Sequence, residues 1–547
     1  DGLFPEVRIN LGGDRVYLGG DRYRGANHIM VDEDILVFKA DYDNDDNVLT
    51  FGIERTETDV YNLFIARYNG EIQFNSIEDF ETGMWSYLRF HTPIAGNDQV
   101  GTAAADFSIE KNTIYAQNKW YANDDFTFTF GFRYDKVLTP DYPHLNPKFL
   151  ERNGIGNNQR FDFDLIQPRV SFNYDATSMF GDRVVDATIR GGRGLFLGRI
   201  PRVWYGNAYS RSGGLTDYNR FRSYSDVIGP MPASSTADPH FFWLGPTSNY
   251  EVRSAWYGDA QGTDPSFEAP SSWRTNIALD LLTTKGYDFT VEYNRDQINE
   301  GVFYQDLGIT QTGTLADGRG TYTGAGDFWL SNTELGDTEA ITFIMKKEWN
   351  DVKFMTAYTN MDASDVYALT SAQAESAYGY QQRWDGENMS ANRSSFMVEH
   401  KFLATLDYTT QLLGDNDTRF SLVFVRKAGE PYSVVFDEPG YNSVTGNSRF
   451  YADYSLAYIP TGASDPNVSF TSAAVATAVM AHVNSTGLSG YKGSHVPKNA
   501  FNSPWYSRLD LRITQDIKVF GDTKLVVFLD MLNLLNMIDD ESGIVRE

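Results

Sequence analysis

The segment from residue 125 to 134 constrains the fold of this chain more than any other. Every second position is aromatic, and polar or small residues stand between: the aromatic residues are Phe126, Phe128, Phe130, Phe132 and Tyr134. Because successive side chains of a β-strand point to opposite faces, this strand would have one aromatic face and one polar face. Repeated many times between polar turns, this pattern indicates a transmembrane β-barrel with its apolar face toward lipid.

Short polar turns separate paired strand candidates at seven places. They are Asp43–Asp46, Asn123–Asp124, Phe180–Asp182, Thr284–Gly286, Asn350–Asp351, Gly414–Asp417 and Gly521–Asp522. Gly, Asn and Asp tolerate the backbone geometry of tight turns. Each turn therefore predicts a hairpin, and seven hairpins predict about fourteen strands, from one near 31–42 to one near 523–534.

Long segments rich in Gly, Ser, Asn, Pro and Tyr lie between these hairpins. They cover approximately residues 58–111, 137–165, 195–272, 299–337, 362–398 and 428–506. Several long loops count against a soluble domain, whereas outer membrane barrels alternate short periplasmic turns with long extracellular loops. The predicted fold class is all-β, a transmembrane antiparallel β-barrel.

Composition agrees with a barrel and excludes several other classes. A chain of 547 residues is long for one soluble domain, but barrel size grows with strand number. No segment approaches the roughly 18 consecutive apolar residues of a membrane-spanning helix. The net charge of -27 argues against nucleic acid as a partner. The absence of cysteine is compatible with passage through an oxidising periplasm.

Several segments, taken in order and spacing, resemble the barrel region of TonB-dependent outer membrane receptors. The resemblance is to the Oar-like group, which carries a carboxypeptidase-regulatory-like domain. The matching segments are 59–64, 74–76, 115–120, 131–135, 167–172, 190–196, 199–204, 273–276, 508–512 and 530–536.

This resemblance implies a 22-stranded barrel with an N-terminal plug, in the outer membrane of a Gram-negative bacterium. Residues 1–547 would be part of that single barrel domain, approximately its eighth to twenty-first strands, with the plug, the early strands and the last strand absent. The chain opens without a signal peptide and stops without a final aromatic-ended strand. Implied partners are the TonB complex of the inner membrane, reached through the missing N-terminal parts, lipopolysaccharide or other outer membrane lipid, and an unknown imported ligand.

We expect no catalytic residue, metal site or cofactor. Asp41, Asp43 and Asp45 have the opening spacing of a calcium loop, but Asp46 and Gly52 stand where that loop needs Gly and Glu. No pair of histidines has the spacing of a metal site, and neither a nucleophile elbow nor a glycine-rich phosphate loop is present. The histidines are His28, His91, His144, His240, His400, His482 and His495.

The segment 195–272 is the best candidate for substrate binding, because exposed aromatic side chains stack on sugars and pack against peptides or chelates. The predicted binding residues are Trp204, Tyr205, Tyr209, Phe242, Trp243, Trp256 and Tyr257. The alternative is that these rings pack on one another or sit in an interfacial girdle. Nearby, Arg193, Arg199 and Arg202 would pair either with acidic loop residues or with lipopolysaccharide phosphates.

Three functions compete for a barrel of this kind. The leading hypothesis is a TonB-dependent receptor that imports a large or scarce solute, such as a peptide, a saccharide or a chelate. The alternatives are a passive porin and a surface adhesion or structural protein; a soluble extracellular β-protein would not explain the alternation of short and long connections. The acidic loops favour a cationic or peptide ligand over an anionic chelate.

Overall fold

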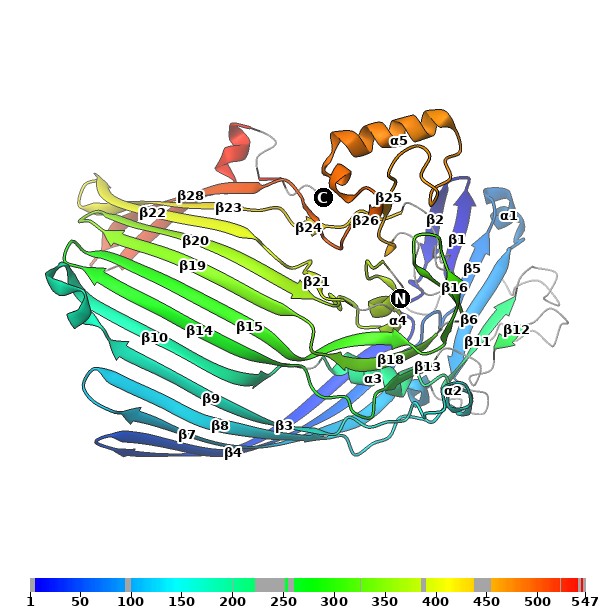
Figure 1. The fold of residues 1–547 in the computed structure, drawn as a ribbon, viewed down its shortest axis with the longest axis horizontal. Coiled ribbons are helices and arrows are strands. Elements are labelled where there is room, and N and C mark those ends of the chain that lie inside the picture. The colour runs from blue at the N-terminus through cyan, green and yellow to red at the C-terminus, as the bar shows by residue number, and fades with distance from the viewer. Residues whose placement is uncertain are drawn as a thin grey trace.

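The fold was analysed in a computed structural model of the chain (Figure 1). It describes residues 5–93, 100–199, 201–221, 251–253, 260–324, 326–384, 390–436, 454–521, 523–539 and 543–544. No helix within these ranges is long and apolar enough to cross a membrane.

Fourteen long strands in the described part of the chain form the wall of an antiparallel β-barrel (Figure 1). Each strand pairs with the next of these strands along the sequence. They are β3 (Asn27–Asn44), β4 (Asn47–Phe64), β7 (Ala105–Tyr121), β8 (Phe126–Leu138), β9 (Phe163–Asp175), β10 (Val184–Leu197), β14 (Ser271–Thr283), β15 (Tyr287–Asp306), β19 (Asp337–Glu348), β20 (Val352–Asp365), β22 (His400–Leu413), β23 (Asn416–Lys427), β28 (Tyr506–Phe520) and β29 (Thr523–Met531).

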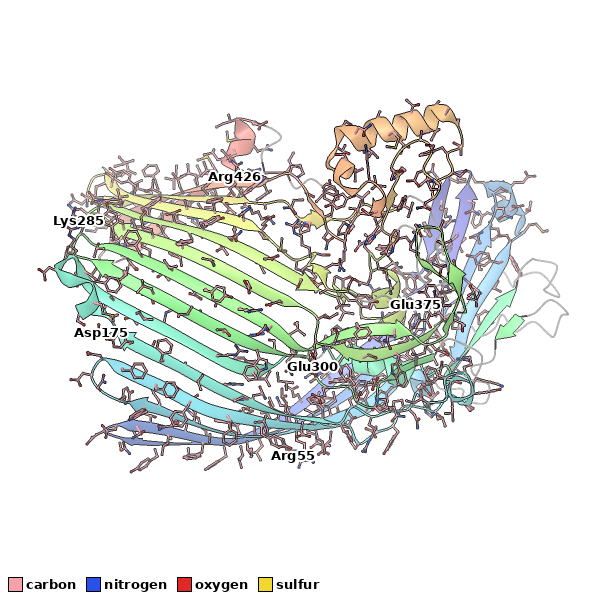
Figure 2. All side chains as sticks on the ribbon, viewed as in Figure 1. Arg55, Asp175, Lys285, Glu300, Glu375 and Arg426 are labelled. Carbon is pink, nitrogen blue, oxygen red and sulfur yellow. The ribbon has the colours of Figure 1, made fainter. Side chains whose placement is uncertain are left out.

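The seven predicted hairpins are confirmed, and so is the predicted strand number. The described short turns lie at one end of the wall, where Figure 2 shows Asp175 and Lys285, far from Glu375 at the other end. Asp522 of the seventh turn lies outside the described residues. The wall strands extend beyond the predicted limits. β3 begins at Asn27, before the expected start near residue 31, and β4 continues to Phe64, into the segment expected to be a loop from residue 58. Alternation was therefore a reliable guide to the strands but not to how far each continues past the apolar part.

The outer face of the wall is apolar. Ile53, Ile114, Tyr134 and Ile166 lie side by side across β4, β7, β8 and β9. The three isoleucines are 55%, 50% and 62% exposed, which is the reverse of a water-soluble sheet. Phe126, Phe128, Phe130 and Phe132 belong to the same face as Tyr134. The opposite face of these strands carries polar side chains such as Thr113, Arg133 and Gln167, so the predicted division into apolar outside and polar inside is confirmed.

The long connections carry secondary structure of their own. A separate six-stranded sheet at the long-segment end contains β1 (Glu6–Leu11), β2 (Asp14–Gly19), β5 (Glu71–Phe74), β6 (Tyr87–Pro93), β11 (Thr216–Phe221) and β12 (Glu251–Arg253). Shorter strands are β13 (Ala260–Thr263), β16 (Ile309–Thr314), β17 (Gly320–Gly324), β18 (Asp327–Thr333), β21 (Asn392–Arg393), β24 (Pro431–Tyr432), β25 (Tyr458–Ile459), β26 (Ser494–His495) and β27 (Phe501–Asn502). The helices are α1 (Ile77–Thr82), α2 (Pro147–Asn153), α3 (Arg202–Ser210), α4 (Ala374–Gly379) and α5 (Ala473–Ser485).

Among the described residues, the largest hydrophobic core lies at the long-connection end of the barrel. Four elements of the long connections contribute to it or contact it there, α3, α4, β13 and β18, and we call these four elements the cap (Figure 1). Side chains of the cap pack against inward-facing residues of β4, β7 and β15, in a core that contains Val60, Ala105, Phe107, Phe161, Tyr205, Tyr209, Phe267, Val302, Tyr304, Phe328, Leu330, Ala374, Ala377 and Tyr378. The strands of a barrel wall do not form such a core by themselves. The cap therefore provides a hydrophobic core like that of a water-soluble protein.

Candidate functional site: the cap and the cavities beneath it

Helix α3 crosses the inside of the barrel just after β10 ends. Gly198 and Pro201 separate the strand from the helix, and Pro201 has no N–H with which to continue the strand ladder. A Cβ added at Gly206 would lie 3.7–3.9 Å from Asn62, Ala105 and Phe107, which is ordinary van der Waals contact, so this side of the helix faces the wall directly. Tyr205 and Tyr209 hold the helix against β4 and β7 by packing with their inward-facing side chains.

Two of the predicted binding residues are buried in the cap. Tyr205 packs edge-on against Phe161 with ring centroids 3.8 Å apart, and Tyr209 stacks on Phe107 at 4.4 Å. They are 3% and 5% exposed, and burial raises the pKa of both hydroxyls. The prediction that these two rings lie exposed on a loop was wrong, and for them the alternative of mutual packing describes the structure.

The other predicted binding residues have different outcomes. Trp204 is only partly buried beside the core and lines a cavity under the cap. Phe242, Trp243, Trp256 and Tyr257 lie outside the described residues. Ligand binding by any residue of this set stays a prediction.

Three neighbouring cavities lie along the inner face of the wall, and two of them reach α3. The wall cavity, of about 700 Å³, is lined by β9, β10, β14 and β15. The tryptophan cavity, of about 440 Å³, reaches Trp204, and the tyrosine cavity, of about 660 Å³, reaches Tyr205. Arg274 lines the first and second, Arg199 the second and third, and Arg169 the first and third. The three cavities therefore meet around these three arginines.

The arginines differ in how far neighbouring carboxylates neutralise them. Arg169 and Arg274 both lie over the ring of Phe196, at 4.5 and 5.7 Å from its centroid. Arg274 also pairs with Asp296 at 3.0 Å. Within the described residues, no carboxylate forms an ion pair with Arg169, whose Nε is buried without a hydrogen-bond partner. Arg169 and Arg199 therefore bring positive charge to the cavities, where anionic and hydroxyl-bearing groups would be favoured.

A continuous polar network joins five strands along the inner face. Arg133 on β8 donates to Glu54 on β4 at 2.8 Å and to Asp135 at 3.0 Å. Thr113 on β7 donates to Asp135, and Gln167 on β9 donates to the same carboxylate at 2.5 Å. Gln167 in turn accepts the backbone N–H of Leu197 on β10 at 3.0 Å. This network fixes the wall of the tyrosine cavity, so its polar groups are positioned before any ligand arrives.

The three arginines near the end of β10 have three different environments. Arg202 pairs with Glu33 of β3, which ties α3 to the wall. Arg199 lines two cavities and has no described ion-pair partner. Arg193 points outward and lies over Trp273, 5.2 Å from the ring centroid. Acidic pairing, one of the two predicted alternatives, is thus found for Arg202.

Sequence reasoning missed the cap and the six-stranded sheet. The available signal for α3 was the spacing of Trp204, Tyr205, Ala208 and Tyr209 after Pro201, which is helical and not strand-like. The arginines that meet under the cap carried no motif, because β9, β10 and β14 bring them together from distant parts of the sequence. Within the described residues, no cluster of three or more His, Asp or Glu side chains is arranged to hold a metal ion.

An apolar outer face, a polar interior, short turns at one end and long connections at the other define an outer membrane β-barrel. The sequence matches the family described as outer membrane beta barrel domain over residues 43–539. The chain belongs to this family and is a protein of the Gram-negative outer membrane. The family is one of membrane barrels and not of enzymes.

The fold is similar to those of solved outer membrane transporters and receptors. The outer membrane transporter YddB from Escherichia coli is similar at 11% identity with a TM-score of 0.54, over 97% of this chain and 54% of that one. The siderophore receptor PirA from Acinetobacter baumannii is similar at 11% identity with a TM-score of 0.44, over 97% of this chain and 54% of that one. The FrpB iron transporter from Neisseria meningitidis is similar at 10% identity with a TM-score of 0.46, over 93% of this chain and 52% of that one. The chain thus spans about half the length of these structures. No curated protein matches its sequence.

Proposed function

We propose that this chain forms part of the barrel of a TonB-dependent receptor of the Oar-like group. The receptor would import a large or scarce solute across the outer membrane. One observation carries the proposal: a hydrophobic cap lies inside the mouth of the barrel, beside cavities that arginines line. The fold shared with the transporter YddB supports it.

The cap supports import by a receptor over passive diffusion. A porin keeps a water-filled channel, whereas here cap residues such as Tyr205 and Tyr304 pack together inside the mouth. Moving the cap would break its hydrophobic packing, which costs free energy. A cap packed in this way therefore suits a receptor that is supplied with energy from the inner membrane. The partner would be the TonB complex, acting through a plug domain of the whole protein.

The cavities support a solute with anionic or hydroxyl groups. Arg169 and Arg199 have no described ion-pair partner, while Trp204 and Phe196 offer aromatic surfaces beside them. The solute would be a peptide, a saccharide or a chelate. This revises the expectation from acidic loops, because the linings of the wall cavity and the tyrosine cavity contain more arginine and lysine than acidic residues, opposite in sign to the net charge of the chain.

The test is uptake in a strain that lacks the natural gene and is complemented with wild-type or variant full-length protein. Labelled peptides, oligosaccharides and ferric chelates would be supplied with and without a protonophore. We expect protonophore-sensitive uptake of one class, lost in Arg169→Gln/Arg274→Gln and retained in Arg512→Gln, an inward arginine of β28 paired with Asp530. Protonophore-resistant uptake would identify a porin, and normal uptake of every class with impaired surface attachment would identify an adhesion protein.

A further inference from the structure

Two outward-facing arginines lie on tryptophan rings at separate places on the barrel wall. Arg193 of β10 lies 5.2 Å from the centroid of Trp273 on β14. Arg426 of β23 lies 5.3 Å from the centroid of Trp505, which directly precedes β28. Both arginines are exposed, and in the described residues neither forms an ion pair with a carboxylate.

The strand register places both pairs on the lipid-facing side. Arg193 is opposite Thr275, two positions along β14 from the exposed Ile277. Arg426 is opposite Phe402, which is itself opposite Tyr358 on β20. Cross-strand partners share one face of a sheet, so each guanidinium belongs to the outer, apolar face.

The two arginines lie at matching heights. Arg193 is nine residues beyond the start of β10 at Val184, and Arg426 is ten residues beyond the start of β23 at Asn416. At about 3.4 Å per residue and a strand tilt of about 40°, these distances project to about 25 Å from the short-turn end. The apolar band of an outer membrane barrel has about this height, so both arginines reach the outer leaflet interface. Figure 2 shows Arg426 well along the wall from Lys285 at the short turns.

Other outward arginines on the wall are neutralised by protein carboxylates. Arg295 of β15 pairs with Asp337 at 2.5 Å and with Glu339 at 3.2 Å. Arg55 of β4 lies 3.5 and 3.6 Å from Glu57 and Glu110. Arg193 and Arg426 are different, because each has an aromatic ring on one side and lipid or solvent on the other.

We propose that Arg193 with Trp273, and Arg426 with Trp505, bind phosphate groups of the glycolipid in the outer leaflet. A guanidinium forms paired, charge-assisted hydrogen bonds with a phosphate, and Trp is favoured at the membrane interface. At the second site His400 stacks on Trp505 at 5.8 Å, its Nδ1 lies 2.9 Å from the hydroxyl of Tyr358, and its Nε2 lies 3.8 Å from Glu399, which Arg393 pairs at 2.7 Å. The two arginines offset the repulsion that a chain of net charge -27 would meet in an anionic leaflet.

The test is native mass spectrometry of the full natural protein in mild detergent, titrated with diphosphorylated lipid A. We expect two bound equivalents for the wild type, one for Arg193→Gln or Arg426→Gln, and at least about tenfold weaker binding for the double variant. Arg295→Gln is the matched control and keeps both equivalents. The variants Arg193→Lys and Arg426→Lys keep the charge and retain part of the binding.

Lipid A from which both phosphates have been removed distinguishes phosphate recognition from general affinity for acyl chains. We expect it to bind the wild type about as weakly as intact lipid A binds the double variant. Equal binding of the two lipids, or undiminished binding by a correctly folded double variant, would overturn the proposal. Heat-modifiable migration on gels shows whether each variant is folded.

Discussion

Arg89 holds the buried carboxylate of Glu71 by two parallel hydrogen bonds of 2.9 Å each. Arg67 donates a further bond of 2.6 Å, and Arg8 lies 3.0 Å from the same carboxylate. The Glu71 side chain is fully buried between β1 and β6 of the six-stranded sheet. One acid therefore joins several arginines in a part of the protein outside the barrel wall.

The Glu71 cluster predicts acid sensitivity of this sheet. Burial alone would raise the pKa of Glu71, but the bonds and charge of Arg89 and Arg67 outweigh burial and lower it to about 2 from 4.5. A lowered pKa contributes stability that is complete above pH 4.5 and is lost as the pH falls toward 2, in total about 3 kcal/mol. Pepsin cleavage within residues 5–93 should rise steeply over this pH range.

Glu71→Gln should show the acid-sensitive state at higher pH, because the uncharged amide leaves the arginines without their shared partner. The matched control is Glu78→Gln, an exposed acid of α1, which should follow the wild type. Identical pH profiles for Glu71→Gln and wild type would contradict the structural role of the cluster.

Truncation of Tyr205 should loosen the cap without preventing barrel assembly. Tyr205→Ala removes a ring that is 3% exposed and packed on Phe161, at a cost of roughly 3 kcal/mol. Trp204→Ala removes a partly buried ring and should cost less. The measurement is protease sensitivity of residues 198–210 in membranes; greater sensitivity for Trp204→Ala than for Tyr205→Ala would show that the packing is described wrongly.

Gly131 should not tolerate even one methyl group. A Cβ there would lie 2.4 Å from the carbonyl oxygen of Ala116 and 2.8 Å from the Cα of Gln117, both parts of the neighbouring strand. Gly131→Ala should lower barrel stability by about 1 to 3 kcal/mol. Gly490→Ala is the control, because no atom lies within 4 Å of its added methyl. The test compares the temperatures at which heat-modifiable migration is lost, and equal temperatures would contradict the close approach.

Asp306 fixes the base of the β16–β17 hairpin. Its carboxylate accepts backbone N–H groups of Gly308 at 2.9 Å, Gly326 at 2.8 Å and Asp327 at 3.0 Å. Asp306→Ala leaves these donors unsatisfied, at roughly 1 to 3 kcal/mol each when buried. Hydrogen exchange of residues 309–324 should accelerate more than tenfold, whereas Thr312→Ala, an exposed change within the hairpin, should have little effect. Unchanged exchange in Asp306→Ala would rule out this role.

The wall could be predicted from sequence because its pattern is local. In β8 the aromatic face repeats every second residue, and a turn such as Thr284–Gly286 marks its own position by composition. Each of the seven expected hairpins is formed by two paired strands. The strand ends could not be predicted as well. Beyond the apolar band the outer face of a strand no longer contacts lipid, so its residues need not alternate between apolar and polar.

The cap could not be predicted in the same way because its core is assembled from distant segments. Val60, Tyr205 and Tyr304 lie in one cluster, although more than 90 residues separate each from the next. Aromatic residues in a polar, glycine-rich segment look the same in sequence whether they are exposed for binding or buried against a barrel wall. The arginines of the cavities are equally hidden, since only the strand register shows that Arg169 and Arg274 share the inner face.

The most direct test of the membrane barrel uses the absence of native cysteine in this sequence. Single cysteines at Thr127, Phe128, Thr129 and Phe130 of the full natural protein would carry a fluorophore in bilayers containing lipids with nitroxide-labelled acyl chains. We predict strong quenching at 128 and 130 and weak quenching at 127 and 129, because only the phenylalanine face contacts lipid. Quenching without this alternation, or stronger at the threonine positions, would contradict the assignment of the outer face and with it the barrel described above.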